Sequence, residues 1–326
     1  MNYQKNGLDL SRIGLGCGYM SNADETDKAK GIAAIHAAFE NGINHFNTAD
    51  FYGAGRSEML IGEALKGYNR DKYFISVKFG ILCAPNGVSY GLDVTPDNIK
   101  SYLTYSLKRL NLDVIDLYLP GRIDLGIPVE ETIGAISELV KAGYVKHVGI
   151  SQVDADILRR AHATHPISLV ESEYSLFNRS IEKDILPTAR ELGIGVVAFG
   201  AVAHGLLAGD WTEERIHKSK GGFIPLFFED NIVKNVTLSK RLAKIAAKKH
   251  ITVSQLAFAW ILSKSEDIIP LIGSVSPAHI KEALDSLDIY LTKDDIKEIE
   301  EVVPENEIAG ASFPNRKFRN GKPVRD

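Results

Sequence analysis

The chain has 326 residues, of which 44% are hydrophobic and 25% are charged, and its formal net charge is −4. These proportions are ordinary for a globular protein, and no apolar run in the sequence approaches the length of a membrane span. A net negative charge gives no broad positive field for a nucleic-acid backbone. We therefore expect a soluble protein that binds a small molecule, with neither nucleic acid nor membrane as a partner and with its oligomeric state left open.

The cysteine content and the amino-terminal sequence both favour a cytoplasmic protein. Cys17 and Cys83 lie far apart and lack CxxC spacing, and the first ten residues are too polar for a signal peptide. We expect the two thiols to be reduced packing residues.

Apolar runs typical of buried strands alternate along the chain with amphipathic stretches typical of helices. The first strand and helix pairs are expected at residues 12–16 and 27–41, 42–47 and 58–66, and 73–78 and 96–110. The next are expected at 114–119 and 129–142, 145–150 and 155–163, and 168–172 and 181–192. The last are 195–199 with 253–262, and 268–272 with 277–284. Eight such units predict an α/β fold in which a parallel sheet closes into a (β/α)8 TIM barrel, preceded by an N-terminal extension.

No linker rich in proline or serine divides the sequence, so we expect a single barrel domain over residues 1–326, with 304–326 as a C-terminal tail. Long loops follow the third and seventh strands, at 80–94 and 204–230. Loops that follow strands build the active sites of such barrels, so these two should wall the ligand site. Their aromatic residues are expected either to line a pocket or to anchor the loops: Tyr90, Trp211, Phe223, Phe227 and Phe228.

A cluster of polar side chains follows the second predicted strand, where residues 46–53 read Phe-Asn-Thr-Ala-Asp-Phe-Tyr-Gly and Ser57 and Glu58 come soon after. This segment resembles the signature of the aldo-keto reductase superfamily, and the resemblance continues from residues 14–16 to 272–274. It implies an oxidoreductase that exchanges hydride between NAD(H) or NADP(H) and a small-molecule carbonyl or alcohol substrate. It also implies that no metal takes part.

The resemblance implies catalytic roles for Tyr52 as proton donor and for Lys78, which ends the third predicted strand. A buried ammonium beside a phenol stabilises the phenolate, so the phenol gives up its proton more readily. Asn47 stands where the family has an aspartate that holds the lysine. Its amide oxygen still accepts a hydrogen bond but carries no negative charge. The substitution therefore either makes the site more positive or only preserves its packing.

A second departure follows the fourth predicted strand, where Gly121 takes the place of the histidine that orients the carbonyl in the family. Water, Arg122 or the substrate itself must then fill the space. His45, two residues before Asn47 and on the same strand face, either compensates or is an ordinary core histidine. The enlarged space also favours a cofactor-retaining lyase or isomerase as an alternative. A nucleotide-binding redox sensor with little turnover is a further one.

The resemblance places the cofactor at the ends of the later strands. Ser151 and Gln152, with Glu171 opposite them, are expected to hold the nicotinamide carboxamide, and Phe199 to stack on its ring. The glycine-rich segment 200–209 offers backbone N–H groups to a pyrophosphate. The remaining cofactor contacts are expected from Gly200, Val202 and His204 in that segment, and from Gly273, Ser274, Val275 and His279 after the eighth strand.

Two residues near the eighth strand weaken the expected preference for NADP(H). Val275 lacks the positive charge that often binds the 2′-phosphate, and Ala283 replaces a common adenine-binding asparagine. His279 or Lys281 are expected to compensate in part. The basic tail is expected either to meet an anionic substrate or to be solvated, through Arg316, Lys317, Arg319, Lys322 and Arg325.

Overall fold

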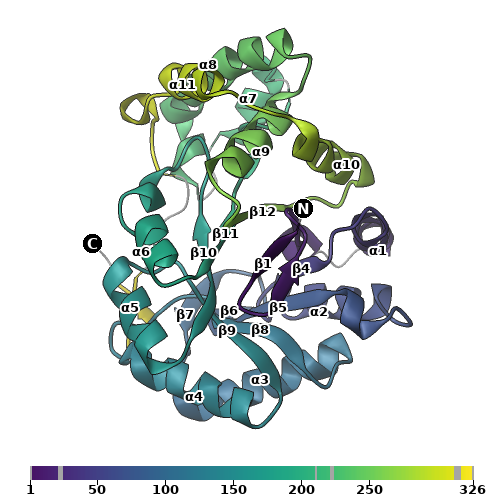
Figure 1. The fold of residues 1–326 in the computed structure, drawn as a ribbon, viewed down its shortest axis with the longest axis vertical. Coiled ribbons are helices and arrows are strands. Elements are labelled where there is room, and N and C mark those ends of the chain that lie inside the picture. The colour runs from purple at the N-terminus through teal and green to yellow at the C-terminus, as the bar shows by residue number, and fades with distance from the viewer. Residues whose placement is uncertain (1, 21–24, 210, 221–223, 312–316, 325–326) are drawn as a thin grey trace.

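A closed barrel of eight parallel strands forms the centre of the molecule, with helices around it (Figure 1). The computed structural model describes residues 2–20, 25–209, 211–220, 224–311 and 317–324. The strands follow one another around the barrel in chain order, and the last pairs with the first. They are β3 (Gly14–Gly16), β4 (His45–Ala49), β5 (Phe74–Phe79), β8 (Ile115–Pro120), β9 (Val145–Ser151), β10 (Ile167–Glu173), β11 (Gly195–Phe199) and β12 (Ile268–Ile272). The predicted (β/α)8 barrel is therefore confirmed.

The eight expected helices are present with ends shifted by a few residues. They are α1 (Glu25–Glu40), α2 (Arg56–Ala64), α3 (Pro96–Leu110), α4 (Val129–Lys141), α5 (Ala155–Thr164), α6 (Ile185–Glu191), α9 (Val253–Lys264) and α10 (Pro277–Asp285). Proline occupies the first turn of α3 and of α10, and the hydroxyl of the residue before each proline does not cap its helix. The Thr95 hydroxyl instead donates to Asp93 Oδ1 at 2.6 Å.

Further helices among the described residues were not predicted: α7 (Glu213–Ser219), α8 (Glu229–Lys248) and α11 (Lys293–Val302). They gather in one part of the molecule, at the top of Figure 1. The connection between β11 and α9 is therefore largely helical. No helix in the described ranges is both long and apolar enough to cross a bilayer.

The N-terminal extension forms an antiparallel hairpin, β1 (Tyr3–Lys5) and β2 (Leu8–Leu10), that closes the amino-terminal end of the barrel. Leu10 is fully buried and belongs to an apolar cluster with Leu169 and Ile269, which lie early in their strands. Gly195 leaves room for the hairpin, because a Cβ there would lie 2.4 Å from the Tyr3 hydroxyl oxygen. The amino-terminal half of the barrel interior is therefore apolar and sealed.

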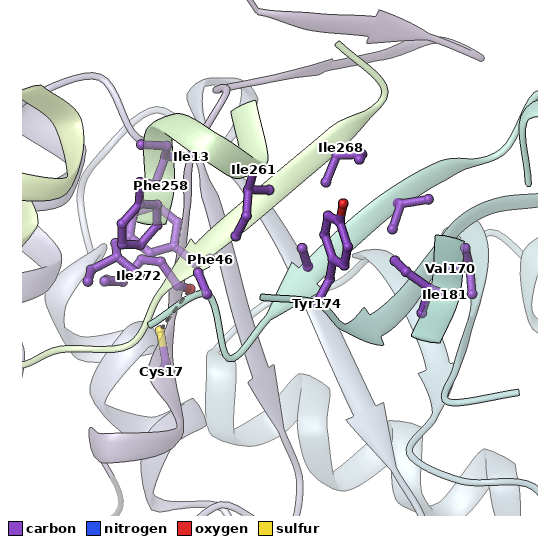
Figure 2. Packing of buried hydrophobic residues seen from close by; sticks show 14 of the residues in the cluster. Ile13, Cys17, Phe46, Val170, Tyr174, Ile181, Phe258, Ile261, Ile268 and Ile272 are labelled. Carbon is purple, nitrogen blue, oxygen red and sulfur yellow. Dashed lines mark hydrogen bonds between the residues drawn. The ribbon is translucent and has the colours of Figure 1, made fainter. Parts of the chain in front are cut away.

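A second apolar layer lies between the strands and the helices. Figure 2 shows Phe258 and Ile261 of α9 directed toward β12, which contributes Ile268 and Ile272. Cys17 belongs to the same cluster, and its burial raises the pKa of the thiol to about 12. A thiol that stays protonated in an apolar layer is a packing residue, as the sequence indicated.

Two short hairpins lie beside the carboxyl ends of the strands. The loop after β5 folds into β6 (Ile81–Cys83) and β7 (Ser89–Leu92), and the tail folds into β13 (Phe318–Arg319) and β14 (Lys322–Pro323). The Asp124 carboxylate, in the loop after β8, accepts hydrogen bonds from the backbone N–H groups of Asn320 at 2.8 Å and Gly321 at 2.5 Å.

Hydrogen bonds to Asp124 and the buried Phe318 side chain anchor residues 317–324. The side chains of Lys317, Arg319 and Lys322 are exposed, which agrees with the expectation of a solvated basic tail. Lys317, Arg319 and Lys322 do not line the cavity described below. Arg316 and Arg325 lie outside the described residues.

We expect Leu10→Ala to lower the free energy of unfolding by about 2–5 kcal/mol, the usual cost of a cavity in a packed core. Chemical denaturation measures this change. The control is Leu287→Ala, because Leu287 is 45% exposed and its loss should cost less than about 0.5 kcal/mol. Equal effects of the two substitutions would show that the hairpin does not seal the barrel.

Candidate active site

A cavity of about 1220 Å³ opens at the carboxyl ends of the barrel strands. It is lined by most of the site residues that the sequence predicted: Asn47, Tyr52, Lys78, Ser151, Glu171, Phe199, Gly200, Val202, His204, Gly273 and His279. Gln152, Ser274 and Val275 are not among its lining residues. The fold therefore brings together groups from β4, β5, β9, β10, β11 and the segment after β12.

Alternation along each strand determines which side chains enter the barrel. Successive interior positions are His45 and Asn47 on β4, and Ser76 and Lys78 on β5. Their contacts show this shared side: His45 Nε2 lies 2.9 Å from Ser76 Oγ, and Asn47 Nδ2 donates to the same oxygen at 3.0 Å. Polar groups from β4 and β5 thus meet inside the barrel, above the apolar seal.

Lys78 is the centre of this polar interior. Its Nζ donates to Asn47 Oδ1 at 2.5 Å and lies 3.0 Å from Glu171 Oε1, and the lysine and glutamate side chains are almost fully buried. Burial alone lowers the pKa of Lys78. The Glu171 carboxylate, followed by the Tyr52 hydroxyl, outweighs that effect and raises the pKa above its ordinary value. The lysine is therefore an ammonium ion at neutral pH.

Of the two alternatives for Asn47, the one in which the site becomes more positive is wrong, because Glu171 supplies a negative charge beside Lys78. The family resemblance placed Glu171 at the nicotinamide carboxamide. That prediction considered each strand separately and gave no contact between strands. In the closed barrel β10 lies across the interior from β5, so a side chain 93 residues away reaches the lysine.

Tyr52 lies in the turn after β4, on the wall of the cavity. Its backbone N–H donates to Ala49 O at 3.2 Å, and its ring packs edge-on against Phe51. The left-handed conformation of Gly53 closes the turn. Lys78 Nζ lies 5.2 Å from the centroid of the Tyr52 ring. The predicted tyrosine and lysine are thus neighbours.

The space beside Gly121 is narrower than the sequence indicated. A Cβ at this position would lie 3.1 Å from the Phe51 ring, 3.3 Å from the Phe79 carbonyl oxygen and 3.4 Å from Ile81. The idea of an enlarged site at Gly121 is therefore wrong, because neighbouring side chains fill the gap.

Arg122 brings positive charge to the cavity beside Gly121. It lines the cavity, and its Nη1 donates to the Gly121 carbonyl at 2.6 Å. Burial lowers the pKa of Arg122, and Tyr52 is first among the nearby groups that oppose this effect. A guanidinium keeps its charge under such conditions and donates several hydrogen bonds.

His45 lies deeper than the cavity and does not line it. Its burial, with the nearby Lys78 charge, lowers the pKa of the imidazole to about 3, so the ring is neutral. This arrangement supports the interpretation of His45 as a core histidine.

Ser151 provides a direct test of whether a nicotinamide fits. Its hydroxyl is buried and has no hydrogen-bond partner among the described residues, yet the residue lines the cavity. A buried hydroxyl of this kind needs a partner, and an amide group entering the cavity supplies one. Gln152 faces elsewhere, since its side-chain oxygen accepts from the Glu173 backbone N–H at 3.2 Å.

The segment after β11 forms another wall of the cavity. His204 Nε2 lies 2.8 Å from Glu173 Oε1, which fixes the imidazole. Arg215 was missed by sequence reasoning: its Nη2 donates to the carbonyls of Gly205 and Ala208, both at 3.2 Å. These bonds hold the glycine-rich backbone in place against the cavity.

The loop aromatics divide between the two roles considered. Trp211 lines the cavity and donates from Nε1 to Leu206 O at 2.8 Å, and Phe227 packs beside it. Tyr90 and Phe228 are exposed. Phe223 lies outside the described residues.

The far end of the cavity contains polar residues that sequence reasoning missed. Thr252 and Glu282 line it, and the Thr252 hydroxyl donates to Glu282 Oε1 at 2.6 Å. The sequence carries a signal for Thr252, because Thr252 and Gln255 form a capping box at the start of α9. Within the described ranges, no group of three or more His, Cys, Asp or Glu residues could hold a metal ion.

Comparisons with known proteins agree with this geometry. The sequence model described as the aldo/keto reductase family matches residues 12–304. A probable aldo-keto reductase 1 of Glycine max is 38% identical over 313 residues, covering 95% of this chain and 90% of that protein.

Two solved structures share the fold. The glycerol dehydrogenase of Gluconobacter oxydans has a TM-score of 0.80 and 27% identity, covering 94% of this chain and 96% of that one. An aldo-keto reductase of Bacillus halodurans in its holo form has a TM-score of 0.79 and 26% identity, with the same coverage. With a family match over most of its length, this chain belongs to the aldo/keto reductase family.

Proposed function

We propose that the chain catalyses reversible hydride exchange between a nicotinamide cofactor and a small carbonyl or alcohol substrate, with Tyr52 as the proton donor for reduction. Family membership makes it an NAD(P)-dependent oxidoreductase. The observation that carries the finer proposal is the placement of Tyr52 on the cavity wall, with the buried Lys78 ammonium 5.2 Å from its ring centroid.

The residues that would hold the cofactor extend along the cavity. The unpartnered Ser151 hydroxyl and the Phe199 ring suit the nicotinamide, and the backbone of residues 200–209 suits the pyrophosphate. His279 lies toward the adenosine end in this assignment. When bound, the cofactor supplies or accepts the hydride.

Proton transfer is the task of Tyr52 and Lys78. In reduction the Tyr52 O–H bond breaks and its proton joins the substrate oxygen, which leaves a phenolate. The adjacent ammonium of Lys78 stabilises that phenolate without giving up its own proton. In oxidation the phenolate takes the proton back from the alcohol.

Arg122 is the donor that we assign to the substrate oxygen in place of a histidine. It lines the cavity beside Gly121 and lies close enough to Tyr52 for their charges to interact. Because Phe51 and Ile81 fill the gap at Gly121, the alternative of a lyase or isomerase loses the observation that favoured it. The other alternative, a nucleotide-binding redox sensor, is distinguished from an enzyme by measuring turnover.

Tyr52→Phe should lower kcat by roughly 100-fold or more, since it removes the positioned acid but keeps the ring. The assay is NAD(P)H oxidation with a panel of small aldehydes and ketones. Cofactor affinity should change less than about threefold, which is the control for folding. A phenylalanine variant with full activity would refute the assignment, and a wild-type protein without turnover would favour the sensor.

NADH and NADPH should bind with affinities within about tenfold, a difference of roughly 1.4 kcal/mol. The reason is the absence of a cation at Val275, whose side chain packs partly buried against the core. Fluorescence titration of both cofactors measures the ratio. A much stronger preference for NADPH would contradict this reasoning and would direct attention to His279 or Lys281.

Gly121→His should destabilise the protein by about 1–3 kcal/mol through overpacking and should not raise kcat/KM. The matched control is Gly134→His, because a Cβ at Gly134 of α4 meets nothing within 4 Å. Thermal unfolding and carbonyl reduction of both variants test this. A Gly121→His variant that is stable and has a higher kcat/KM would contradict this prediction. It would show that the missing histidine limits the activity of the natural protein.

A further inference from the structure

We infer that Glu171 is the counter-ion of the Lys78–Tyr52 pair, and that Asn47 and Glu171 together replace the single aspartate that the family resemblance places at position 47. Glu171 is then a positioning residue that acts through the lysine, rather than a ligand of the nicotinamide carboxamide. The inference rests on the proposed role of Tyr52 for its kinetic test. Its structural basis is independent of that role.

Both oxygens of the Glu171 carboxylate contact Lys78, and one of them also contacts Asn47. Oε1 lies 3.0 Å from Lys78 Nζ, while Oε2 accepts from Asn47 Nδ2 at 2.7 Å and lies 3.3 Å from Lys78 Nζ. The carboxylate therefore spans the lysine and the amide. Both of its oxygens thus have partners within the protein.

The Asn47 amide has one orientation that satisfies its neighbours. Oδ1 accepts from Lys78, and Nδ2 donates to Glu171 and to Ser76. An aspartate at position 47 would place an oxygen 2.7 Å from the Glu171 oxygen, so two carboxylates would face each other. Asparagine is therefore the residue type that lets a carboxylate approach the lysine from β10.

Charge balance makes this pairing necessary. An isolated buried ammonium is strongly unfavourable, and removal of one partner of a buried pair leaves that cost uncompensated. Around Lys78 the nearest carboxylate is Glu171, because Glu173 on the same strand contacts His204 and Asn178 instead. The negative charge expected on β4 is thus provided from β10.

Other titratable groups surround the pair but do not replace Glu171. The pKa of His45 is lowered to about 3 and that of Cys17 is raised to about 12, so both are neutral near pH 7. Arg122 stays charged, and burial raises the pKa of Tyr19. Burial, followed by Glu58, raises the pKa of Asp50 to about 7. Asp50 is present in every variant below, so its titration contributes equally to each pH profile. Differences between the profiles therefore come from the changes at positions 171 and 47.

The test exchanges the carboxylate and the amide between positions 171 and 47. It uses three variants: Glu171→Gln, Asn47→Asp, and the two combined. The double variant keeps one carboxylate and one amide but transposes them. The first readout is the pH profile of kcat/KM for carbonyl reduction. The second, which needs no turnover, is the tyrosinate absorbance of each protein minus that of the same protein with Tyr52→Phe. Asp267→Asn is the control, since it removes a buried carboxylate from an ion pair with Arg190 at the other end of the barrel.

Glu171→Gln should move the basic limb of the profile, and the Tyr52 tyrosinate midpoint, to lower pH by about one to two units, since an uncompensated ammonium favours the phenolate. Asn47→Asp should move both to higher pH. The double variant should return both toward the wild type and should also recover the melting temperature lost in Glu171→Gln. Asp267→Asn should move neither limb nor midpoint.

Several results would overturn the inference. One is a Glu171→Gln variant with an unchanged pH profile and a weakened affinity for NAD(P)H, as expected of a carboxamide ligand. Another is a double variant no more stable than Glu171→Gln, including one in which neither folds. Wild-type protein without turnover would instead refute the proposed function, and the tyrosinate titration and the melting temperatures would still decide the role of Glu171.

Discussion

The buried ammonium of Lys78 is the constraint on which the rest of the site depends. Its side chain is almost fully buried, so its charge must be balanced and its hydrogen bonds satisfied largely by side chains that point into the barrel. Glu171, Asn47 and Tyr52 do this from two other strands and a turn, and Ser76 anchors the amide from below. The positions of these groups follow from one requirement.

The hairpin of β1 and β2 limits where the groups that balance the Lys78 charge can lie. Because Leu8, Leu10 and Tyr3 seal the amino-terminal end, the interior has one polar end and one apolar end. Polar side chains gather next to the cavity, where a ligand reaches them. The same division explains why His45, one layer deeper, is neutral and structural although it lies on the strand face of Asn47.

The sequence predicted what depends on local periodicity, and it failed where distant segments meet. All eight barrel strands and their helices follow from apolar spacing. The 20-residue helix α8 was missed although its buried residues recur at helical spacing, because no element was assigned between the loop that ends at residue 230 and the helix expected at 253–262. Tyr52 was found from one motif, and Lys78 from its place at the end of the third predicted strand together with the family resemblance. The role of Glu171 was not, since its approach to Lys78 depends on barrel closure and not on either strand alone. The contacts that narrow the space at Gly121 also come from separate segments.

The anchoring of residues 317–324 has a consequence for when the contacts around the cavity form during synthesis. Asp124 lies two residues after Arg122, and its backbone partner Asn320 is 196 positions further along the chain. Barrel closure likewise joins β12 to β3. Chains fold from the amino end as they leave the ribosome. β3 therefore lacks its β12 neighbour until residues 268–272 have emerged, and the loop beside Arg122 lacks its anchor until residues 317–324 have emerged. A nascent chain that lacks residues 268–272 or 317–324 therefore cannot make all the contacts that surround the cavity.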